Sequence, residues 1–365
     1  MKKIFHLIFI VISFMPAKSQ EDTALYIFMG HPRDDDKTYE YVLKTVEKID
    51  YSKFDLILLG GDLTWNTSAE ISTLEYCDNI FNLGDENTHL AIGNHDNDNV
   101  ASLLDYTKKP RYYAFTKNNI TFLVLDTEIN TPDFSGDQLE LIQNVADTIE
   151  TSDYLILLQH RIFWMIGNDD LTYLLDSVGA STRNLGTTNF YEEVYPNLRK
   201  AKDKGVEVLC LAGDRTDLNI EYFPEDSIQF LASGMKGTYT DDNNYTILLT
   251  HDLISGKLDW NFLALSEIDT IDPTIIIPQI NTLFQDLDIY PNPGLDVYRI
   301  FNKTGERNNI HVKVLDINGT EIMETTFRNG HNSIDIDLTG FSSGVYFIRL
   351  SDNREIATGK IIKIK

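Results

Sequence analysis

Residues 90–96 read LAIGNHD, an apolar run that leads directly into Gly, Asn, His and Asp. Upstream, residues 56–62 read LILLGGD and repeat this arrangement. Each stretch is typical of a buried β-strand that ends in a turn. Because ligands gather beyond the carboxyl ends of the strands in open α/β sheets, we expect Asp62, Asn94 and His95 to lie in one site.

The rest of the first 265 residues alternates between short apolar runs and amphipathic stretches. Several apolar runs lack polar alternation, which is typical of strands buried on both faces. Strands alternating with helices indicate a layered α/β fold. The predicted strands are 25–29, 56–59, 88–92, 120–125, 154–158, 206–211, 228–232 and 245–249, and the predicted helices are 37–49, 136–148 (with Ser135 as N-cap) and 189–204.

Three further apolar runs end in polar residues. They lead into Gly30-His31-Pro32-Arg33, Gln159-His160 and Gly213-Asp214-Arg215-Thr216. In their order along the chain, the five strand ends resemble the metal-binding segments of the calcineurin-like metallophosphoesterases. That family's pattern is Asp-x-His, Gly-Asp, Gly-Asn-His-Asp or Glu, a lone His, and Gly-His-x-His. The resemblance implies an αββα-type sandwich and two metal ions that clamp a phosphate and activate a hydroxide.

The resemblance gives a role to each matching residue. Asp62 matches the carboxylate that bridges the two metals, and Asn94 and His160 match ligands of the second metal. His95 matches the histidine that meets the phosphate and protonates the leaving oxygen, a task that suits a group titrating near neutral pH. Asp96, in the same motif, is predicted to contact substrate.

The departures from the family pattern fall on the first and last segments. His31 stands in place of Asp, and Asp214 in place of His, so both remain competent metal ligands. Arg33 and Thr216 each stand in place of His. Threonine is a poor ligand, and an arginine is a fixed cation with no lone pair to give. The first metal position therefore loses two ligands.

These substitutions predict one divalent ion with an arginine in place of the second, although two ions remain an alternative. An oxygen-rich set of Asp62, Asn94, His160 and Asp214 favours Mn, Fe(II) or Mg over structural zinc. Arg33 is predicted to be both catalytic and substrate-binding, because a guanidinium grips phosphate oxygens through parallel N–H donors, and Arg215 is a second candidate clamp.

Two functions from different classes follow from this site. The first is a secreted metallophosphoesterase acting on a small phosphate ester of unknown identity. The second is a catalytically inactive relative that binds an anion or glycan at the cell surface. The segment from 161 to 190, directly after His160, is predicted to overhang the site and influence the choice of substrate, and a structural surface excursion is the alternative.

The N-terminal segment predicts export. Residues 1–19 combine two early lysines, an apolar core and a small-residue cleavage site, as in a secretory signal peptide. No later stretch reaches the roughly 20 apolar residues of a membrane-spanning helix. Residues 20–265 are then predicted to form the phosphoesterase domain, and 266–285 a linker.

Residues 286–365 predict a small antiparallel β-sandwich, because short alternating apolar segments are separated by Asn-Gly and Ser-Gly turns. The run Tyr290-Pro291-Asn292-Pro293, Gly319, Leu338 and the run Gly344-Val345-Tyr346-Phe347 resemble the C-terminal sorting domain of the Bacteroidetes type IX secretion system. This resemblance implies contact with that secretion machinery and a secreted or cell-surface location. An ordinary β-sandwich accessory module is the open alternative.

The composition limits the possible partners. The formal net charge is −25, and loss of the three lysines in residues 1–19 would bring it to −28. Such an acidic protein repels nucleic acid phosphates and anionic membranes, so neither is predicted as a partner. Cys77 and Cys210 have no zinc-type spacing, and the sequence leaves open whether they pair.

Overall fold

The structure is a computed structural model. It describes residues 23–34, 41–214, 219–224, 227–270, 287–290, 292, 294–302, 311–316, 320–326, 333–351 and 356–364. Several sequence predictions lie outside these ranges, namely the signal peptide 1–19, residues 37–40 of a predicted helix, Arg215, Thr216, most of the linker 266–285, Pro291, Pro293 and Gly319.

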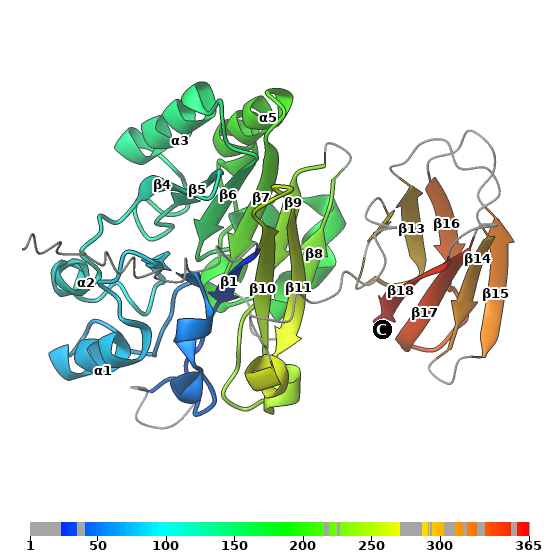
Figure 1. Cartoon of the computed structure of the whole chain (residues 1–365), viewed down its shortest axis with the longest axis horizontal. Coiled ribbons are helices and arrows are strands. Elements are labelled where there is room, and N and C mark those ends of the chain that lie inside the picture. Colours follow the sequence, from blue (N-terminus) through cyan, green and yellow to red (C-terminus); the bar gives the residue numbers. More distant parts are fainter. Residues whose placement is uncertain are drawn as a thin grey trace, which may run out of the picture.

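Two β-sheets form the centre of the region up to residue 264 (Figure 1). The first has the order β11-β10-β1-β2-β3, in which β1, β2 and β3 are parallel. The second has the order β4-β5-β6-β7-β9-β8, in which β5, β6, β7 and β9 are parallel. The strands are β1 Thr23–Met29, β2 Leu56–Leu59, β3 Thr88–Leu90, β4 Tyr113–Lys117, β5 Ile120–Val124, β6 Tyr154–Gln159, β7 Glu207–Ala212, β8 Ile220–Tyr222, β9 Gln229–Ala232, β10 Tyr245–Asp252 and β11 Leu258–Ala264.

Apolar side chains from both sheets fill the space between them. Phe28 and Leu58 of the first sheet and Phe122 and Leu211 of the second are fully buried in one cluster. The ring of Tyr26 meets that of Phe122 edge-on, with 6.0 Å between centroids. A second cluster joins the first sheet to α1 and α2, and a third joins the second sheet to α3 and α5. The layers therefore follow the predicted αββα order.

The helices confirm part of the sequence prediction. The expected helix 136–148 is present, although the side chain of Ser135 makes no capping hydrogen bond. The expected helix 189–204 is a π-helical turn followed by α5. The α-helices are α1 Ile71–Phe81, α2 Val100–Thr107, α3 Gly136–Thr148, α4 Ala180–Arg183 and α5 Tyr195–Asp203, and the short 3-10 or π segments are η1 Val46–Lys48, η2 Tyr51–Lys53, η3 Phe163–Met165, η4 Asp169–Ser177, η5 Phe190–Val194, η6 Asp241–Asn243 and η7 Leu265–Thr270.

The predicted helix 37–49 is wrong over its described part. Val42 forms an isolated antiparallel bridge with Arg33, so the chain folds back on the segment that follows β1. The backbone N–H of Asp34 donates to the carbonyl of Tyr41 at 2.8 Å. The apolar stripe of this stretch still faces the core, because Val42 and Val46 are fully buried. Tertiary burial and the return toward Arg33 outweigh the helical spacing.

The C-terminal strands form two small sheets of their own, with orders β12-β13-β16 and β15-β14-β17-β18. Every strand pairing in them is antiparallel among the described residues. Tyr298, Val312, Ile336 and Ile348 are fully buried in a shared core, which confirms an all-β domain. The strands are β12 Leu287–Tyr290, β13 Val297–Asn302, β14 His311–Leu315, β15 Glu321–Thr326, β16 Ser333–Asp337, β17 Gly344–Ser351 and β18 Ile356–Lys363.

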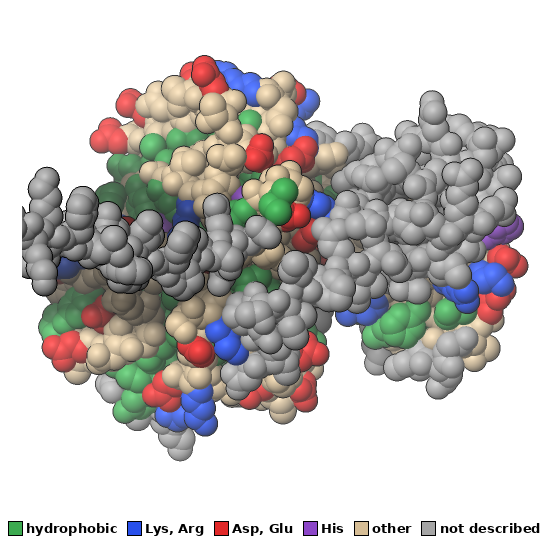
Figure 2. Space-filling view, viewed as in Figure 1, with side chains coloured by type: hydrophobic (Ala, Val, Ile, Leu, Met, Phe, Trp, Pro, Cys, Tyr) green, Lys and Arg blue, Asp and Glu red, His purple; other side chains and the backbone are tan. Residues whose placement is uncertain are grey.

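The core of the first region continues past the expected boundary at residue 265. Leu265 and Ile268 of η7 are 1% and 2% exposed and pack in the same cluster as β1. Acidic side chains occupy several separate places on the face shown in Figure 2, in line with the net charge.

Candidate metal centre and active site

The two sheets meet at glycines that stand at the carboxyl ends of their strands. Gly60 follows β2 of the first sheet, and Gly213 follows β7 of the second. A Cβ atom on Gly213 would lie 2.1 Å from the carbonyl oxygen of Gly60, so this approach requires glycine. Side chains from both sheets can therefore reach a common point. The strand ends that meet here carry His31, Asp62, Asn94, His95, His160 and Asp214.

Four of these residues form a buried cluster. His31, Asp62 and His160 each offer a ligand atom, and these atoms lie within 4.8 Å of one another. Asp214 Oδ1 lies 3.3 Å from His31 Nε2 and 4.0 Å from His160 Nε2. All four side chains are at most 1% exposed. The first sheet supplies His31 and Asp62, and the second supplies His160 and Asp214.

His31 carries buried nitrogen atoms with no hydrogen-bond partner in the described part of the chain. Its Nε2 lies 3.1 Å from Asp62 Oδ2 and 3.3 Å from Asp214 Oδ1, but neither contact has hydrogen-bond geometry. Buried polar atoms in proteins are normally hydrogen-bonded or coordinate an ion. An imidazole nitrogen that faces two carboxylate oxygens therefore fits a divalent metal ligand.

His160 presents one defined nitrogen to the cluster. Its Nδ1 lies 2.7 Å from the carbonyl oxygen of Gly60, which can only accept, so Nδ1 carries the hydrogen. Nε2 is then directed at Asp62 Oδ1, 3.5 Å away, and at Asn94 Oδ1, 3.4 Å away. A backbone bond of this kind is the usual way in which a metal-binding histidine is oriented.

The charges of the cluster influence one another strongly. Burial alone would raise the pKa of Asp62, but His160, His31 and Arg33 outweigh burial and lower it well below its usual range. Burial likewise opposes ionisation of Asp214, and its contacts with His31 and His160 lower its pKa overall. Both carboxylates are therefore ionised at neutral pH, as metal coordination requires.

Arg33 lies on the carboxylate that the sequence resemblance assigns to metal bridging. Its Nη1 donates to Asp62 Oδ2 at 2.7 Å. The guanidinium carbon lies 3.8 Å from the ring centroid of Trp65, a cation–π contact. One oxygen of Asp62 thus already faces a fixed positive charge.

His95 lies at the more open side of the cluster, with a side chain that is 28% exposed. Its backbone N–H donates to Asp62 Oδ1 at 2.9 Å, and its Nδ1 donates to the carbonyl of Trp65 at 3.0 Å. Nε2 lies 4.0 Å from Asp62 Oδ2. Burial lowers the pKa of His95 below its ordinary value, although the nearby Asp62 carboxylate opposes this shift. The lowered pKa favours the neutral ring.

Asp96 does not fit the expected contact with substrate. Its side chain is fully buried, and its carboxylate accepts hydrogen bonds from the backbone N–H groups of Asp62, Leu63 and Gly93 at 2.7, 3.0 and 2.9 Å. Asp62 has a φ of +56°, a left-handed conformation that is uncommon outside glycine. Asp96 therefore holds the turn that carries Asp62.

The segment 161–190 contacts the cluster from the side of Asp214. The hydroxyls of Ser181 and Thr182 both donate to Asp214 Oδ2. Arg161 forms a two-point pair with Glu128, with Nε 2.6 Å from Oε1 and Nη2 2.5 Å from Oε2. This part of the chain therefore holds the side chain of Asp214 in the cluster.

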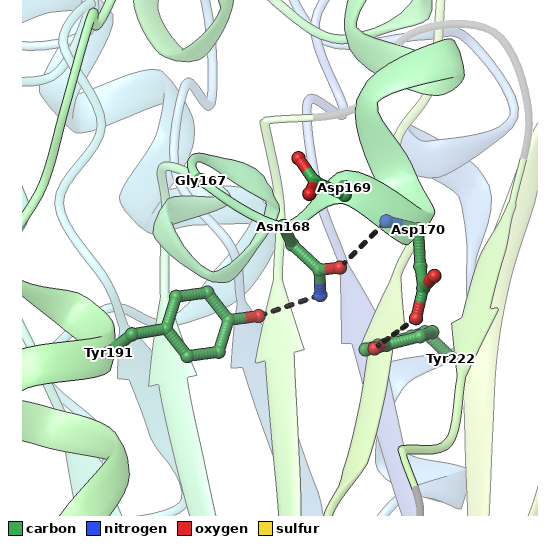
Figure 3. Close-up of a pocket in the computed structure, with 6 residues that line it drawn as sticks. All are labelled: Gly167, Asn168, Asp169, Asp170, Tyr191 and Tyr222. Carbon is green, nitrogen blue, oxygen red and sulfur yellow. Dashed lines mark hydrogen bonds between the residues drawn. The ribbon is translucent and has the colours of Figure 1, made fainter.

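A separate pocket of about 280 Å³ is lined by residues 167–170 of the same segment and by Tyr191 and Tyr222 (Figure 3). Within it, Asn168 donates to the hydroxyl of Tyr191 at 2.8 Å, and the hydroxyl of Tyr222 donates to Asp170 at 3.2 Å. None of the cluster residues lines this pocket. The pocket is therefore distinct from the buried cluster.

Sequence reasoning missed the residues that support the cluster from outside the five motifs. Trp65 follows Asp62 by three residues, so it could have been noticed as an aromatic residue in the same strand-end segment that could contact Arg33. Ser181 and Thr182 lie more than 30 residues before Asp214 in the chain, with no local pattern that links them. Cys77 in α1 and Cys210 in β7 are both buried, and no disulfide joins them.

Comparison with known proteins confirms both resemblances. Residues 29–144 match the family model of the calcineurin-like phosphoesterases, and residues 288–365 match the secretion system C-terminal sorting domain. The chain therefore combines a calcineurin-like phosphoesterase region with a type IX sorting tail. The tail indicates export to the cell surface or beyond and interaction with the type IX machinery. No curated protein matches the chain.

Solved structures add little to this. A DUF3244 family protein with an immunoglobulin-like β-sandwich fold, from Bacteroides vulgatus ATCC 8482, is 15% identical over 22% of this chain and 85% of its own length, with a TM-score of 0.20. The spore cortex lytic enzyme SleM of Clostridium perfringens is 10% identical over 95% of this chain and 100% of its own, with a TM-score of 0.16. Scores this low carry no argument about fold or function. In the described residues, every helix is too short or too polar to span a bilayer.

Proposed function

We propose that the protein is a secreted metal-dependent phosphoesterase that uses one divalent metal ion, with Arg33 in the role of the second. The observation that carries this proposal is the position of Arg33, whose Nη1 lies 2.7 Å from Asp62 Oδ2. In the family, the carboxylate that matches Asp62 faces a second metal ion; in this chain it faces the guanidinium cation of Arg33 instead.

His31, Asp62, His160 and Asp214 are the proposed ligands, with Asn94 as a further oxygen donor beside His160. Two imidazoles and three oxygen donors suit Mn, Fe(II) or Mg better than a structural zinc site. The bound ion would polarise the phosphate ester and lower the pKa of a coordinated water.

The chain's own residues bind and orient the substrate in this proposal. Arg33, whose guanidinium carbon lies 3.8 Å from the ring centroid of Trp65, donates its remaining N–H groups to phosphate oxygens as negative charge develops on them. His95, whose side chain is 28% exposed, gives a proton from Nε2 to the leaving oxygen. Because burial favours the neutral ring, this step requires the negative charge of a bound phosphate ester beside Nε2, which raises the pKa of His95.

The test combines metal content with turnover of p-nitrophenyl phosphate and bis-p-nitrophenyl phosphate. We expect one ion per chain at full activity and loss of activity on chelation. Arg33→Ala should lower kcat/KM by about 100-fold or more, the usual effect of removing a donor that stabilises developing charge. Arg33→Lys should be intermediate, because lysine keeps the charge without the fork.

Arg183→Ala is the matched control, since Arg183 is exposed and, among the described residues, its guanidinium bonds only the carbonyl of Asp176. Two ions per chain at full activity would refute the proposal, as would unchanged turnover in Arg33→Ala. Metal binding without turnover of either ester would favour the alternative, an inactive surface protein that binds an anion.

A further inference from the structure

A short turn of the segment 161–190, residues 179–182, bonds both the backbone and the side chain of Asp214. The N–H of Asp214 donates to the carbonyl of His160 at 2.9 Å, and the N–H of Gly179 donates to the carbonyl of Asp214 at 3.1 Å. The hydroxyls of Ser181 and Thr182 both donate to Oδ2 of its carboxylate. Backbone and side chain of Asp214 are thus fixed by the same turn.

The direction of the hydroxyl bonds is set by the backbone. Thr182 Oγ1 accepts the N–H of Ile162 at 3.1 Å, so its single hydrogen is left for Asp214 Oδ2. With two donors on Oδ2, the other oxygen, Oδ1, is the one that faces His31 Nε2 at 3.3 Å. The carboxylate is therefore oriented to offer one oxygen to the cluster.

The shape of the turn depends on Gly179. A Cβ atom at this position would lie 1.7 Å from Asp214 Oδ1, which is the oxygen that faces the cluster. The turn is also anchored beside His160, because Arg161 Nη1 donates to the carbonyl of Ser181 while the same guanidinium is paired with Glu128. Its position is therefore tied to a residue adjacent to another proposed ligand.

We infer that Ser181 and Thr182 are positioning residues that hold Asp214 Oδ1 in place for a divalent metal ion. The inference rests on the proposed function. A carboxylate has two equivalent oxygens and a free rotation about its last bond, so it needs outside donors to present one oxygen reproducibly. The segment 161–190 would then serve metal affinity, rather than the choice of substrate that the sequence suggested.

The experiment measures equilibrium binding of Mn²⁺ to the full chain by calorimetry, with the signal of free Mn²⁺ in electron paramagnetic resonance as a second readout. The test variants are Ser181→Ala, Thr182→Val and the double variant. Loss of such supporting bonds typically weakens metal affinity by 10–100-fold. We expect about 10-fold for each single variant and about 100-fold for the double variant.

Two kinds of control separate positioning from folding. Thr172→Val makes the same chemical change in the same segment and should bind Mn²⁺ as the unmodified protein does, because its exposed hydroxyl bonds only the carbonyl of Asn168 in the described part of the chain. The double variant Ser181→Thr with Thr182→Ser keeps both hydroxyls and should retain affinity. Gly179→Ala should abolish binding, because its methyl group occupies the place of Oδ1.

The outcomes distinguish the two proposals. If the unmodified protein binds no Mn²⁺, the proposed function fails and this inference fails with it. If the unmodified protein binds Mn²⁺ and the Ser181→Ala, Thr182→Val double variant binds within threefold of it, only the positioning role is overturned. If the hydroxyl-retaining variant loses as much affinity as the double variant, packing and not hydrogen bonding supports Asp214, and the inference is again overturned.

Discussion

Replacing Asp96 by alanine should destabilise the phosphoesterase region more than any other change in its motif. The carboxylate accepts three backbone N–H groups, from Asp62, Leu63 and Gly93, at 2.7 to 3.0 Å. Asp96 is fully buried, so water cannot freely replace these bonds. The alanine variant would leave three donors without their acceptor in a turn whose central residue, Asp62, has positive φ.

The magnitude follows from the bond type. A hydrogen bond to a charged group contributes about 1.5–3 kcal/mol, which for three bonds gives roughly 5 kcal/mol or more. Part of this is recovered because the buried carboxylate no longer has to be desolvated. We therefore expect the free energy of unfolding to fall by about 3 kcal/mol. The free energy of unfolding of Asp96→Asn should lie between those of the unmodified protein and Asp96→Ala, because its amide offers one acceptor oxygen in place of two.

Urea unfolding followed by tryptophan fluorescence measures this difference. Asp98→Ala is the matched control, because Asp98 is exposed in the same loop, and its effect should stay within about 0.5 kcal/mol. An Asp96→Ala variant as stable as the Asp98→Ala variant would refute the idea that this carboxylate holds the turn.

Three further predictions concern residues around the site and the core. Burial, with Lys109 and Lys117, lowers the pKa of His89 to about 3, so below pH 6.5 the unfolded chain binds a proton that the folded chain does not. Between pH 7 and pH 5, the free energy of unfolding of the unmodified protein should therefore fall by about 2 kcal/mol more than that of His89→Gln. Urea titration at both pH values measures the difference, and equal losses would contradict a lowered pKa of His89. Trp65→Leu should lower kcat/KM about 10-fold by removing the cation–π support of Arg33, with Trp65→Phe milder, and unchanged kinetics would show that the stacking is irrelevant. Phe122→Ala should cost about 3–5 kcal/mol in urea unfolding, because Phe122 is fully buried between the sheets, and a loss under 1 kcal/mol would mean that the site collapses around the cavity.

The strand ends were predictable because each is a local pattern. Asp62, His95 and His160 follow apolar runs directly, and position at the carboxyl end of a buried strand is sufficient to place them together. Arg33 was expected where a metal ion would sit, from its place in the first motif, whereas its contact with Asp62 was not foreseen. These predictions needed only the order of the strands and the chemistry of the residue types.

The remainder depends on tertiary contacts that no local pattern contains. The helix expected at 37–49 gave way to a bridge between Val42 and Arg33. Helix α1 was overlooked although Leu74, Cys77 and Phe81 are spaced three and four apart and are all buried. The role of Asp96 was misjudged because its partners are backbone groups, which a side-chain motif does not reveal.

The contact between Gly60 and Gly213 has a consequence for stability as well as chemistry. A cation shared by His31 and Asp62 from one sheet and His160 and Asp214 from the other would fasten both halves of the sandwich at a single point. A free cation concentration 100 times the dissociation constant would raise the free energy of unfolding by about 2.7 kcal/mol. Resistance of the exported protein to heat and proteases would then track the supply of that cation in its surroundings.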